Sequence, residues 1–305
     1  MGRKDKIDIA TGVIIINKHE GVTSHRIVQI LRRLFDTPRV GHTGTLDPLA
    51  TGVLPILIGR AVKASDFLVA EDKEYVAEMT LGLRTDTDDI TGEILEECSK
   101  IPTKEEVFEA VNSFIGDIEQ IPPMYSAIKV GGRKLVDLAR EGITVERKSR
   151  NVTIHSIKTE QISERVYKLY VSCTKGTYIR TLCHDIGGKL SCGAVMSALE
   201  RTRSGSFTLE GAHTIEELEA LTIEERAALV KPTEELFADC PEICVNDFYA
   251  KLIRGGTELY QKKLGTSIEN GQYVRIKHNG TFIALGQVDE FESGSAVRPV
   301  KLFVL

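Results

Sequence analysis

The sequence contains no tryptophan, and its six cysteines are scattered along the chain. None forms a C-x-x-C pair, and Cys240 and Cys244, four positions apart, have no second pair beside them. Structural zinc sites need paired ligand spacing, and disulfide frameworks belong to oxidising compartments. We therefore predict reduced cysteines, no metal site and a cytoplasmic location.

Long apolar runs are also missing. No window approaches the ~18 apolar residues that cross a bilayer. The apolar patch near the N-terminus is broken by Asp8 and has no A-x-A-like cleavage site. We expect neither a membrane span nor a signal peptide.

Motifs for nucleotides and metals are absent as well. The chain has neither the G-x-x-x-x-G-K-S/T phosphate loop nor the G-x-G-x-x-G fingerprint, and no nucleophile elbow is visible. The acidic stretch that begins at Asp86 fails as a calcium loop, because Ile90 and Thr91 stand where an EF-hand needs Asp or Asn and then Gly. We expect a structured turn there, and no cofactor.

The net charge of −5 is unevenly distributed. Residues 210–239 hold nine acidic and two basic residues, whereas residues 129–150 hold seven basic and three acidic ones. A local basic arm can bind phosphates although the whole chain is acidic. On charge alone, a solvated surface loop is the simpler interpretation of residues 129–150.

Hydrophobic periodicity predicts strands mixed with helices before residue 240. Apolar residues recur at helical spacing over residues 24–36, where Ser24 can act as the cap. Thr103 and Glu106 form a capping box for a helix expected to end at Gly116. Residues 214–230 give a further helical region, with Thr214 and Glu217 as a second capping box. Without regular βαβ alternation, the fold class is α+β with a mixed or antiparallel sheet flanked by helices.

The chain changes character near Pro241. One short helix is followed by closely spaced strands, and Asn279-Gly280 between alternating segments is a strong hairpin signal. Residues 240–305 therefore indicate a small all-β module.

The stretch GHTGTLDPLATGVLPI, residues 41–56, holds a single acidic residue, Asp47. Asp before Pro commonly starts a turn, so a structural role is a sound interpretation. The apolar strand expected after it would place this loop carboxylate over the edge of a core, where a cation can tune it. Phospho-aspartyl chemistry would need an acid where Leu49 stands. Tyr75, Tyr178 and Arg180 have the same ambiguity between packing and function.

Several segments together resemble the TruB-type tRNA pseudouridine synthases, in family order over about residues 11–207. They are NKHEGVTS, VGHTGTLDPLATGVLPILIGRAVK, KEYVAEMTLGLRTDTDD, IPPMYSAIKVGGRKL, REG, GTYIRTLCHDIG and GAVMSALERTRSGSF. The end of the chain resembles the family's small PUA domain. The resemblance implies a catalytic domain over residues 1–239, with a thumb insertion at about 125–150, and a PUA-like β-barrel RNA-binding domain over 240–305.

The resemblance also implies a reaction. Such enzymes isomerise uridine 55 in the T-loop of tRNA by cleaving the C1′–N1 bond, rotating the base and forming a C1′–C5 bond. By matching positions, Asp47 is the essential carboxylate, Arg180 pairs with it, and Tyr75 stacks on the target base. The positions implied to bind substrate are Tyr178 and Leu199 in the uridine pocket, His42 where the base leaves the loop, Lys129, Arg133 and Lys134 on the thumb, and Lys251, Arg254, Lys262 and Lys263 in the C-terminal part.

Two departures and two alternatives stay open. The family usually reads D-K-P-x-G where this chain has NKHEG, residues 17–21, and it often has an aromatic where Val136 stands. The expected protein is a stand-alone monomer that acts on the T-arm without guide RNA, cofactor or metal. The alternatives are an RNA-guided relative and a non-enzymatic RNA-binding or RNA-folding protein.

Overall fold

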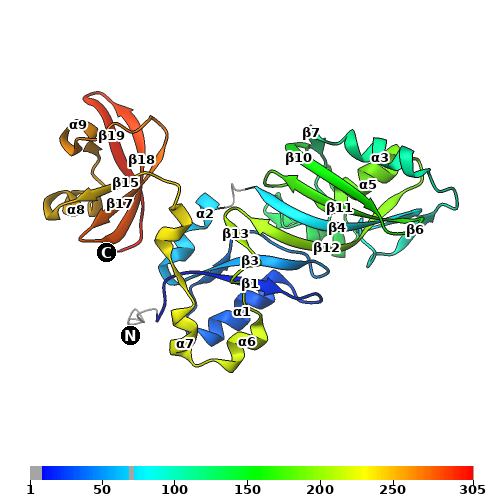
Figure 1. Cartoon of the computed structure of the whole chain (residues 1–305), viewed down its shortest axis with the longest axis horizontal. Helices are drawn as coiled ribbons and strands as arrows, with labels where there is room; N and C mark the ends of the chain where they lie inside the picture. The colour runs from blue at the N-terminus through cyan, green and yellow to red at the C-terminus, as the bar shows by residue number, and fades with distance from the viewer. Residues whose placement is uncertain (1–8, 69–71, 305) are drawn as a thin grey trace.

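The computed structural model describes residues 9–68 and 72–304, and Figure 1 shows two sheets on one chain. The larger sheet has the strand order β14-β1-β3-β12-β4-β11-β10-β7, with β2 on β3 and β13 on β12. β12 runs parallel to β3, and the other pairs are antiparallel. Its strands are β1 (Gly12–Lys18), β2 (Val40–His42), β3 (Thr51–Ile58), β4 (Lys73–Leu81), β7 (Gly116–Gln120), β10 (Arg150–Gln161), β11 (Val166–Cys173), β12 (Ala194–Ser204), β13 (Phe207–Thr208) and β14 (Lys231–Pro232).

Helices cover one face of this sheet, which confirms the expected α+β class with a mixed sheet. α5 packs on β12 and β4, α3 packs on β10 and α5, and α6 packs on α1 and β1. The helices are α1 (Ser24–Leu34), α2 (Ser65–Leu68), α3 (Lys104–Asn112), α4 (Leu135–Arg140), α5 (Ile179–Lys189), α6 (Ile215–Ala220), α7 (Ile223–Ala228), α8 (Asp247–Arg254) and α9 (Gln261–Leu264), with 3-10 turns η1 (Gly59–Ala64) and η2 (Thr233–Phe237).

Strand β1 is buried on both faces, which explains its uninterrupted apolar sequence. Ile14 and Ile16 pack into the core beneath the helices, whereas Val13 and Ile15 face a second core on the opposite side. A strand between two cores has no solvent face and therefore needs no polar alternation. The second core contains Phe237, from η2, and connects the large sheet to the C-terminal part of the chain.

The predicted capping boxes are confirmed at Thr103–Glu106 and Thr214–Glu217. The helical region predicted for residues 214–230 forms two short helices, α6 and α7. Two details of the helix predictions were wrong. α3 ends at Asn112, and Gly116 instead opens β7 with a positive φ of 109°. Ser24 is not the cap of α1, because the Thr23 side chain accepts the bond from the Arg26 amide.

The segment of residues 41–52, which holds Asp47, begins inside β2 and ends inside β3. The chain between these strands therefore spans only residues 43–50, which holds the Asp47 turn close to the sheet. Short strands β5 (Leu83–Thr85) and β6 (Ile94–Glu97) form a separate two-stranded sheet.

The C-terminal sheet has the order β15-β17-β18-β19-β16. The predicted hairpin is confirmed: Asn279 and Gly280 have φ values of 48° and 75° between β17 and β18, as a type I′ turn requires. The sheet is curled and compatible with a PUA-like module. Its strands are β15 (Glu242–Val245), β16 (Leu259–Tyr260), β17 (Tyr273–His278), β18 (Thr281–Phe291) and β19 (Gly294–Leu302).

All six cysteines are free thiols. Burial raises the pKa of Cys173 to about 11, and it raises the pKa of Cys183 to about 12, so both stay protonated and packed at neutral pH. Across residues 9–68 and 72–304, no helix is both long enough and apolar enough to traverse a bilayer.

Candidate active site

Asp47 lies in the short connection between β2 and β3, and its backbone is fixed from two sides. The Asp47 carbonyl accepts a hydrogen bond from the Ala50 amide at 3.0 Å, which closes the expected turn. On the other side, the buried Ser24 hydroxyl binds both backbone groups of Leu46, accepting from its amide at 2.8 Å and donating to its carbonyl at 3.0 Å. Asp47 is therefore a turn residue whose side chain is left free for another task.

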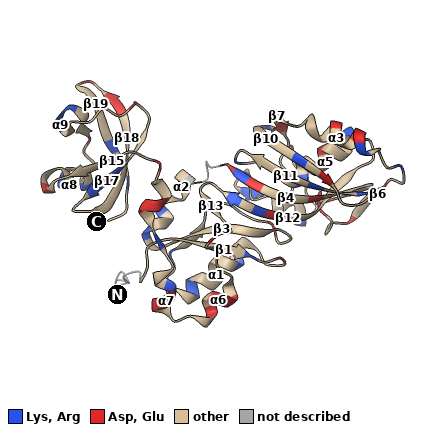
Figure 2. Ribbon diagram, in the orientation of Figure 1, with Lys and Arg blue, Asp and Glu red and all other residues tan. Residues whose placement is uncertain are grey.

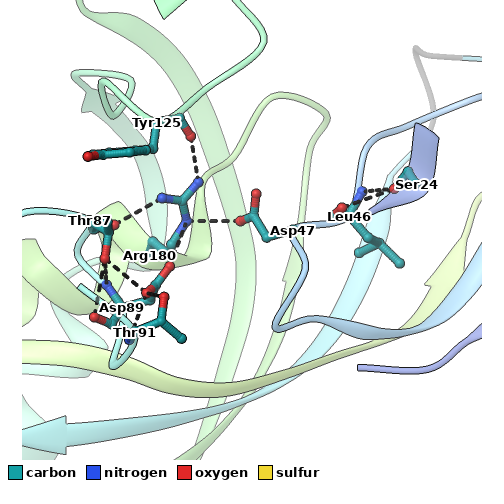
Figure 3. Close-up of polar contacts among 8 residues, drawn as sticks. All are labelled: Ser24, Leu46, Asp47, Thr87, Asp89, Thr91, Tyr125 and Arg180. Carbon is teal, nitrogen blue, oxygen red and sulfur yellow. Dashed lines mark hydrogen bonds and ion pairs between the residues drawn. The ribbon is translucent and has the colours of Figure 1, made fainter. Parts of the chain in front are cut away.

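Arg180, at the start of α5, contacts that carboxylate (Figure 3). Its Nε donates to Asp47 Oδ2 at 2.9 Å, although 133 positions separate the two residues. The Arg180 side chain is 4% exposed and that of Asp47 34% exposed. In the described part of the chain no hydrogen bond reaches Asp47 Oδ1, so one oxygen is anchored and the other is available to a ligand.

The rest of the Arg180 guanidinium is held by backbone. One Nη donates to the Thr87 carbonyl at 2.9 Å, and the other donates to the Tyr125 carbonyl at 2.8 Å. The Asp89 carboxylate lies 4.0 Å from the same Nε that donates to Asp47. Because the fork of donors is rigid, these bonds set the direction from which Arg180 approaches Asp47.

Asp89 organises the turn that the sequence predicted for this acidic stretch. Its Oδ1 accepts from the Thr87 hydroxyl at 2.9 Å, and from the amide and hydroxyl of Thr91 at 3.0 and 2.6 Å. The expected structured turn is confirmed. Within the described ranges, no group of three His, Cys, Asp or Glu side chains is arranged to hold a metal ion.

A pocket of about 280 Å³ opens over Asp47. This volume lies just below the ~300–1,000 Å³ typical of small-ligand sites, which suits a single base. Its lining combines aromatic and apolar side chains with several cationic ones. The lining comprises residues 43–47, 125–127 and 175–180 together with Lys73, Tyr75, Leu199 and Arg201.

Five of the predicted residues meet in this pocket: Asp47, Tyr75, Tyr178, Arg180 and Leu199. Tyr75 and Leu199 come from the neighbouring strands β4 and β12 and are each 8% exposed. Burial raises the pKa of Tyr75, and the adjacent Arg201 guanidinium opposes that rise. Burial also raises the pKa of Tyr178, so both phenols are neutral at physiological pH.

His42 lies nearby but not in the pocket lining. It stands on β2 opposite Ile56, and its buried Nδ1 has no hydrogen-bond partner among the described residues. Burial, helped by the charge of Arg201, lowers the pKa of His42, so the ring is neutral at pH 7.

The three predicted thumb bases lie outside the pocket, on the exposed hairpin formed by β8 (Lys129–Val130) and β9 (Arg133–Lys134). Gly131 and Gly132, with φ values of 58° and 85°, make its tight turn. Arg133 forms an ion pair with Glu141. Residues 125–127, at the start of the predicted thumb, do line the pocket.

Sequence reasoning missed two buried cations beside Asp47. The Lys18 ammonium donates to the His19 carbonyl at 2.9 Å and to the Pro48 carbonyl at 3.3 Å, directly under the Asp47 turn. Burial lowers the pKa of Lys18 to about 8, against the opposing pull of the Asp47 charge. Arg201, from β12, is 1% exposed and lines the pocket. The sequence gave no local signal that either side chain is buried. Lys18 is the last residue of an apolar strand, and Arg201 lies in a basic run.

Comparison with known proteins identifies the family. A model described as "TruB family pseudouridylate synthase (N terminal domain)" matches residues 32–179, and one described as "tRNA pseudouridylate synthase B C-terminal domain" matches residues 180–238. A tRNA pseudouridine synthase B from Clostridium tetani is 43% identical, covering 90% of this chain and 95% of its own length. Another from Alkaliphilus oremlandii is 46% identical, with 91% and 93% covered. The chain belongs to the TruB family.

Solved structures agree with this assignment. A chain in the crystal structure of a Cbf5-Nop10-Gar1 complex is similar over 99% of this chain and 88% of its own length, with a TM-score of 0.74 and 28% identity. A chain in an H/ACA RNP bound to a substrate RNA containing 2′-deoxyuridine gives a TM-score of 0.72 at 26% identity, with 99% and 88% covered. The TruB resemblance read from the sequence is thus confirmed, and the protein is a pseudouridine synthase of this family.

Proposed function

We propose that this TruB-family protein isomerises uridine 55 in the T-loop of tRNA to pseudouridine, alone and without a cofactor. The observation that carries the proposal is the partly exposed Asp47 carboxylate, anchored through one oxygen by Arg180 at the floor of a base-sized pocket. The relatives named tRNA pseudouridine synthase B, at 43–46% identity, support tRNA as the substrate.

The free oxygen of Asp47 acts on the ribose of the target uridine. It either attacks C1′ or removes a C2′ proton, and each route breaks the C1′–N1 bond with a single carboxylate. The Arg180 ion pair orients Asp47 for this step. The freed uracil stays between Tyr75, Tyr178 and Leu199 while it rotates. C5 then bonds to C1′ as Asp47 leaves C1′ or returns the proton to C2′, and C5 loses a proton while N1 gains one.

Flipping a uridine out of a folded loop costs a few kcal/mol, which stacking on aromatic side chains offsets. Tyr75 is the stacking residue in the proposal, and His42 fills the place that the base leaves. Outside the pocket, Lys129, Arg133 and Lys134 bind phosphates of the T-arm stem. We further propose that residues 240–305 are a PUA-like RNA-binding domain that follows a catalytic domain of residues 1–239.

The direct test is to incubate an unmodified tRNA transcript with the purified protein alone and map pseudouridine by carbodiimide-dependent primer extension. We expect one new stop, at position 55, that is missing from a transcript with cytidine at that position. The similarity to Cbf5 chains gives the RNA-guided enzyme as the competing function. No product from the protein alone, with product after adding a guide RNA and partner proteins, would favour that alternative.

A further inference from the structure

The pocket over Asp47 carries more positive charge than a bound uracil requires. Among the described residues that line it, Asp47 supplies the single carboxylate, whereas four side chains are cationic: Lys73, Lys175, Arg180 and Arg201. The chain as a whole has a net charge of −5, so this positive excess is local. Uracil is neutral at physiological pH. The negative charge of a nucleotide in RNA lies on the phosphates that flank it.

Lys175 differs from the other three cations in being exposed and unpaired. Arg180 donates to Asp47 and to two backbone carbonyls, and Arg201 donates to two more. Lys73 is only 8% exposed. The Lys175 side chain is open to solvent and makes no hydrogen bond or ion pair within residues 9–68 and 72–304. An exposed residue that also lines a pocket lies at its mouth, so the Lys175 ammonium is the cation that an incoming ligand meets there.

The loop that carries Lys175 joins β11 to α5 and is held at both ends. At one end the Thr174 hydroxyl accepts from the Thr153 amide at 2.9 Å, and the Thr174 amide donates to the Thr153 carbonyl at 2.9 Å. At the other end the buried Gln120 side chain accepts from the Tyr178 amide at 3.0 Å and donates to the Tyr178 carbonyl at 3.2 Å. The backbone of Lys175 is therefore fixed at the pocket, while its long side chain is free to follow a ligand.

We propose that the Lys175 ammonium binds a phosphate flanking the target uridine once that nucleotide is flipped into the pocket. The proposal rests on the proposed function, because it concerns the same pocket. A nucleotide that enters base first leaves its phosphates at the mouth, where Lys175 can bind one as a point charge. Entry also brings phosphate charge toward the Asp47 carboxylate, and a cation at the mouth offsets the repulsion between these like charges.

The salt dependence of RNA binding tests the proposal, with Lys175→Gln compared with Lys158→Gln. Lys158, on β10, is also exposed and lies outside the pocket lining, so each variant removes one surface charge. Affinities for a T-arm stem-loop are measured in the Asp47→Asn background, where we expect no turnover during the titration. Lys175→Gln should weaken binding about 3- to 10-fold at about 0.1 M salt and reduce the slope of log K against log salt by about one. Lys158→Gln should change neither.

Two further stem-loops locate the contact. In each, a neutral methylphosphonate replaces one of the two phosphates that flank the target uridine. With one of these RNAs, Lys175→Gln should have no further effect, because the charge that Lys175 contacts is already gone. Lys175→Arg, which keeps the cation, should keep the parent affinity and salt slope.

An unchanged salt slope for Lys175→Gln, or an equal change for Lys158→Gln, would overturn the proposal. A Lys175→Gln effect that persists in full on both methylphosphonate RNAs would also overturn it, because the contact would then lie elsewhere. Loss of affinity in Lys175→Arg, or a lowered melting temperature of Lys175→Gln, would assign the side chain to local structure and contradict the proposal. An inactive wild-type protein would instead contradict the proposed function and leave these binding measurements interpretable, so the two failures are distinguishable.

Discussion

Thr23 and Ser24 are neighbouring hydroxyl residues with different tasks. Thr23 accepts a hydrogen bond from the Arg26 amide and caps α1. Ser24 points the other way and binds both backbone groups of Leu46, beside Asp47 (Figure 3). The first contact stabilises a helix, whereas the second fixes the residue next to the proposed catalytic carboxylate.

Replacing each residue by alanine should separate these tasks. Ser24→Ala leaves the buried Leu46 amide without a partner, a loss of ~1–3 kcal/mol, and releases the Asp47 turn. We expect isomerisation to slow about 10-fold or more, with RNA affinity unchanged. Thr23→Ala should cost ~1 kcal/mol of unfolding free energy with little effect on rate. Single-turnover kinetics and urea unfolding measure both, and equal rates for the two variants would contradict this division.

At the scale of elements, the turn of residues 86–91 is tied to α5 by an ion pair outside the pocket. His184 Nδ1 lies 3.0 Å from Asp88 Oδ1, one helical turn beyond Arg180. The Asp88 hydrogen bond raises the pKa of His184, and the nearby Asp185 carboxylate adds to this, whereas Arg84 opposes it. Asp88 also accepts, through its carbonyl, a bond from the Met196 amide at 3.1 Å, so the turn is joined to β12 as well.

This ion pair makes a predictable contribution to stability. A histidine whose pKa is higher in the folded state stabilises the protein fully below its unfolded value near 6.5, and the contribution disappears as pH rises through the folded value. His184→Gln should therefore lower the unfolding free energy by roughly 0.2–1 kcal/mol at about pH 5.5, and by less at about pH 8.5, since the pair is partly exposed. Urea unfolding at both pH values checks this, and a difference that grows with pH would contradict it.

Local sequence patterns predicted helices and turns better than they predicted tertiary contacts. The capping box at Thr103–Glu106 and the Asn279-Gly280 turn were found because their physics lies within a few residues. Ser24 was taken for a cap because its partner, Leu46, lies 22 positions away. Helix α4 was missed inside a segment rich in Pro and Gly, where Leu135 and Leu138 are buried by tertiary packing.

The candidate site shows the same limit of prediction from local sequence. Asp47 and Arg180 were paired only through the family resemblance, because no local signal connects residues 133 positions apart. Lys18 and Arg201 have side chains that are usually exposed, so their burial under the pocket follows from the assembled strands alone. The sequence gave no sign that Arg201 and Arg203 differ. Arg201 is buried, whereas Arg203 is partly exposed and forms an ion pair with Glu74.

At the scale of the whole molecule, aromatic side chains join the two sheets. Phe237 lies 5.9 Å from Phe282 and 6.0 Å from Phe303, ring to ring, and all three belong to one hydrophobic core with Leu57 and other residues of the large sheet. Acidic residues colour α6 and α7 in Figure 2, whereas the basic segment of residues 129–150 follows β7 in the chain. The most acidic and the most basic segments therefore belong to different elements.

Removing one ring from this aromatic cluster should allow the two sheets to unfold separately. Phe237→Ala removes a buried ring, for a loss of about 3–5 kcal/mol, and we expect calorimetry to resolve two unfolding transitions where the wild type has one. Phe291→Ala is the matched control, because that ring contacts Tyr260 within the C-terminal sheet. A single transition for Phe237→Ala, lowered no more than for Phe291→Ala, would contradict the role of the junction.

The central claim is that Asp47 performs the chemistry on a uridine held in the pocket above it. The most direct test is tritium release from a T-arm stem-loop labelled at uridine C5, with the wild type and Asp47→Asn compared under single-turnover conditions and RNA binding measured in parallel. Because the amide can neither attack C1′ nor take a C2′ proton, we predict release by the wild type alone, with similar RNA affinity for both. Release by Asp47→Asn at the wild-type rate would contradict the account.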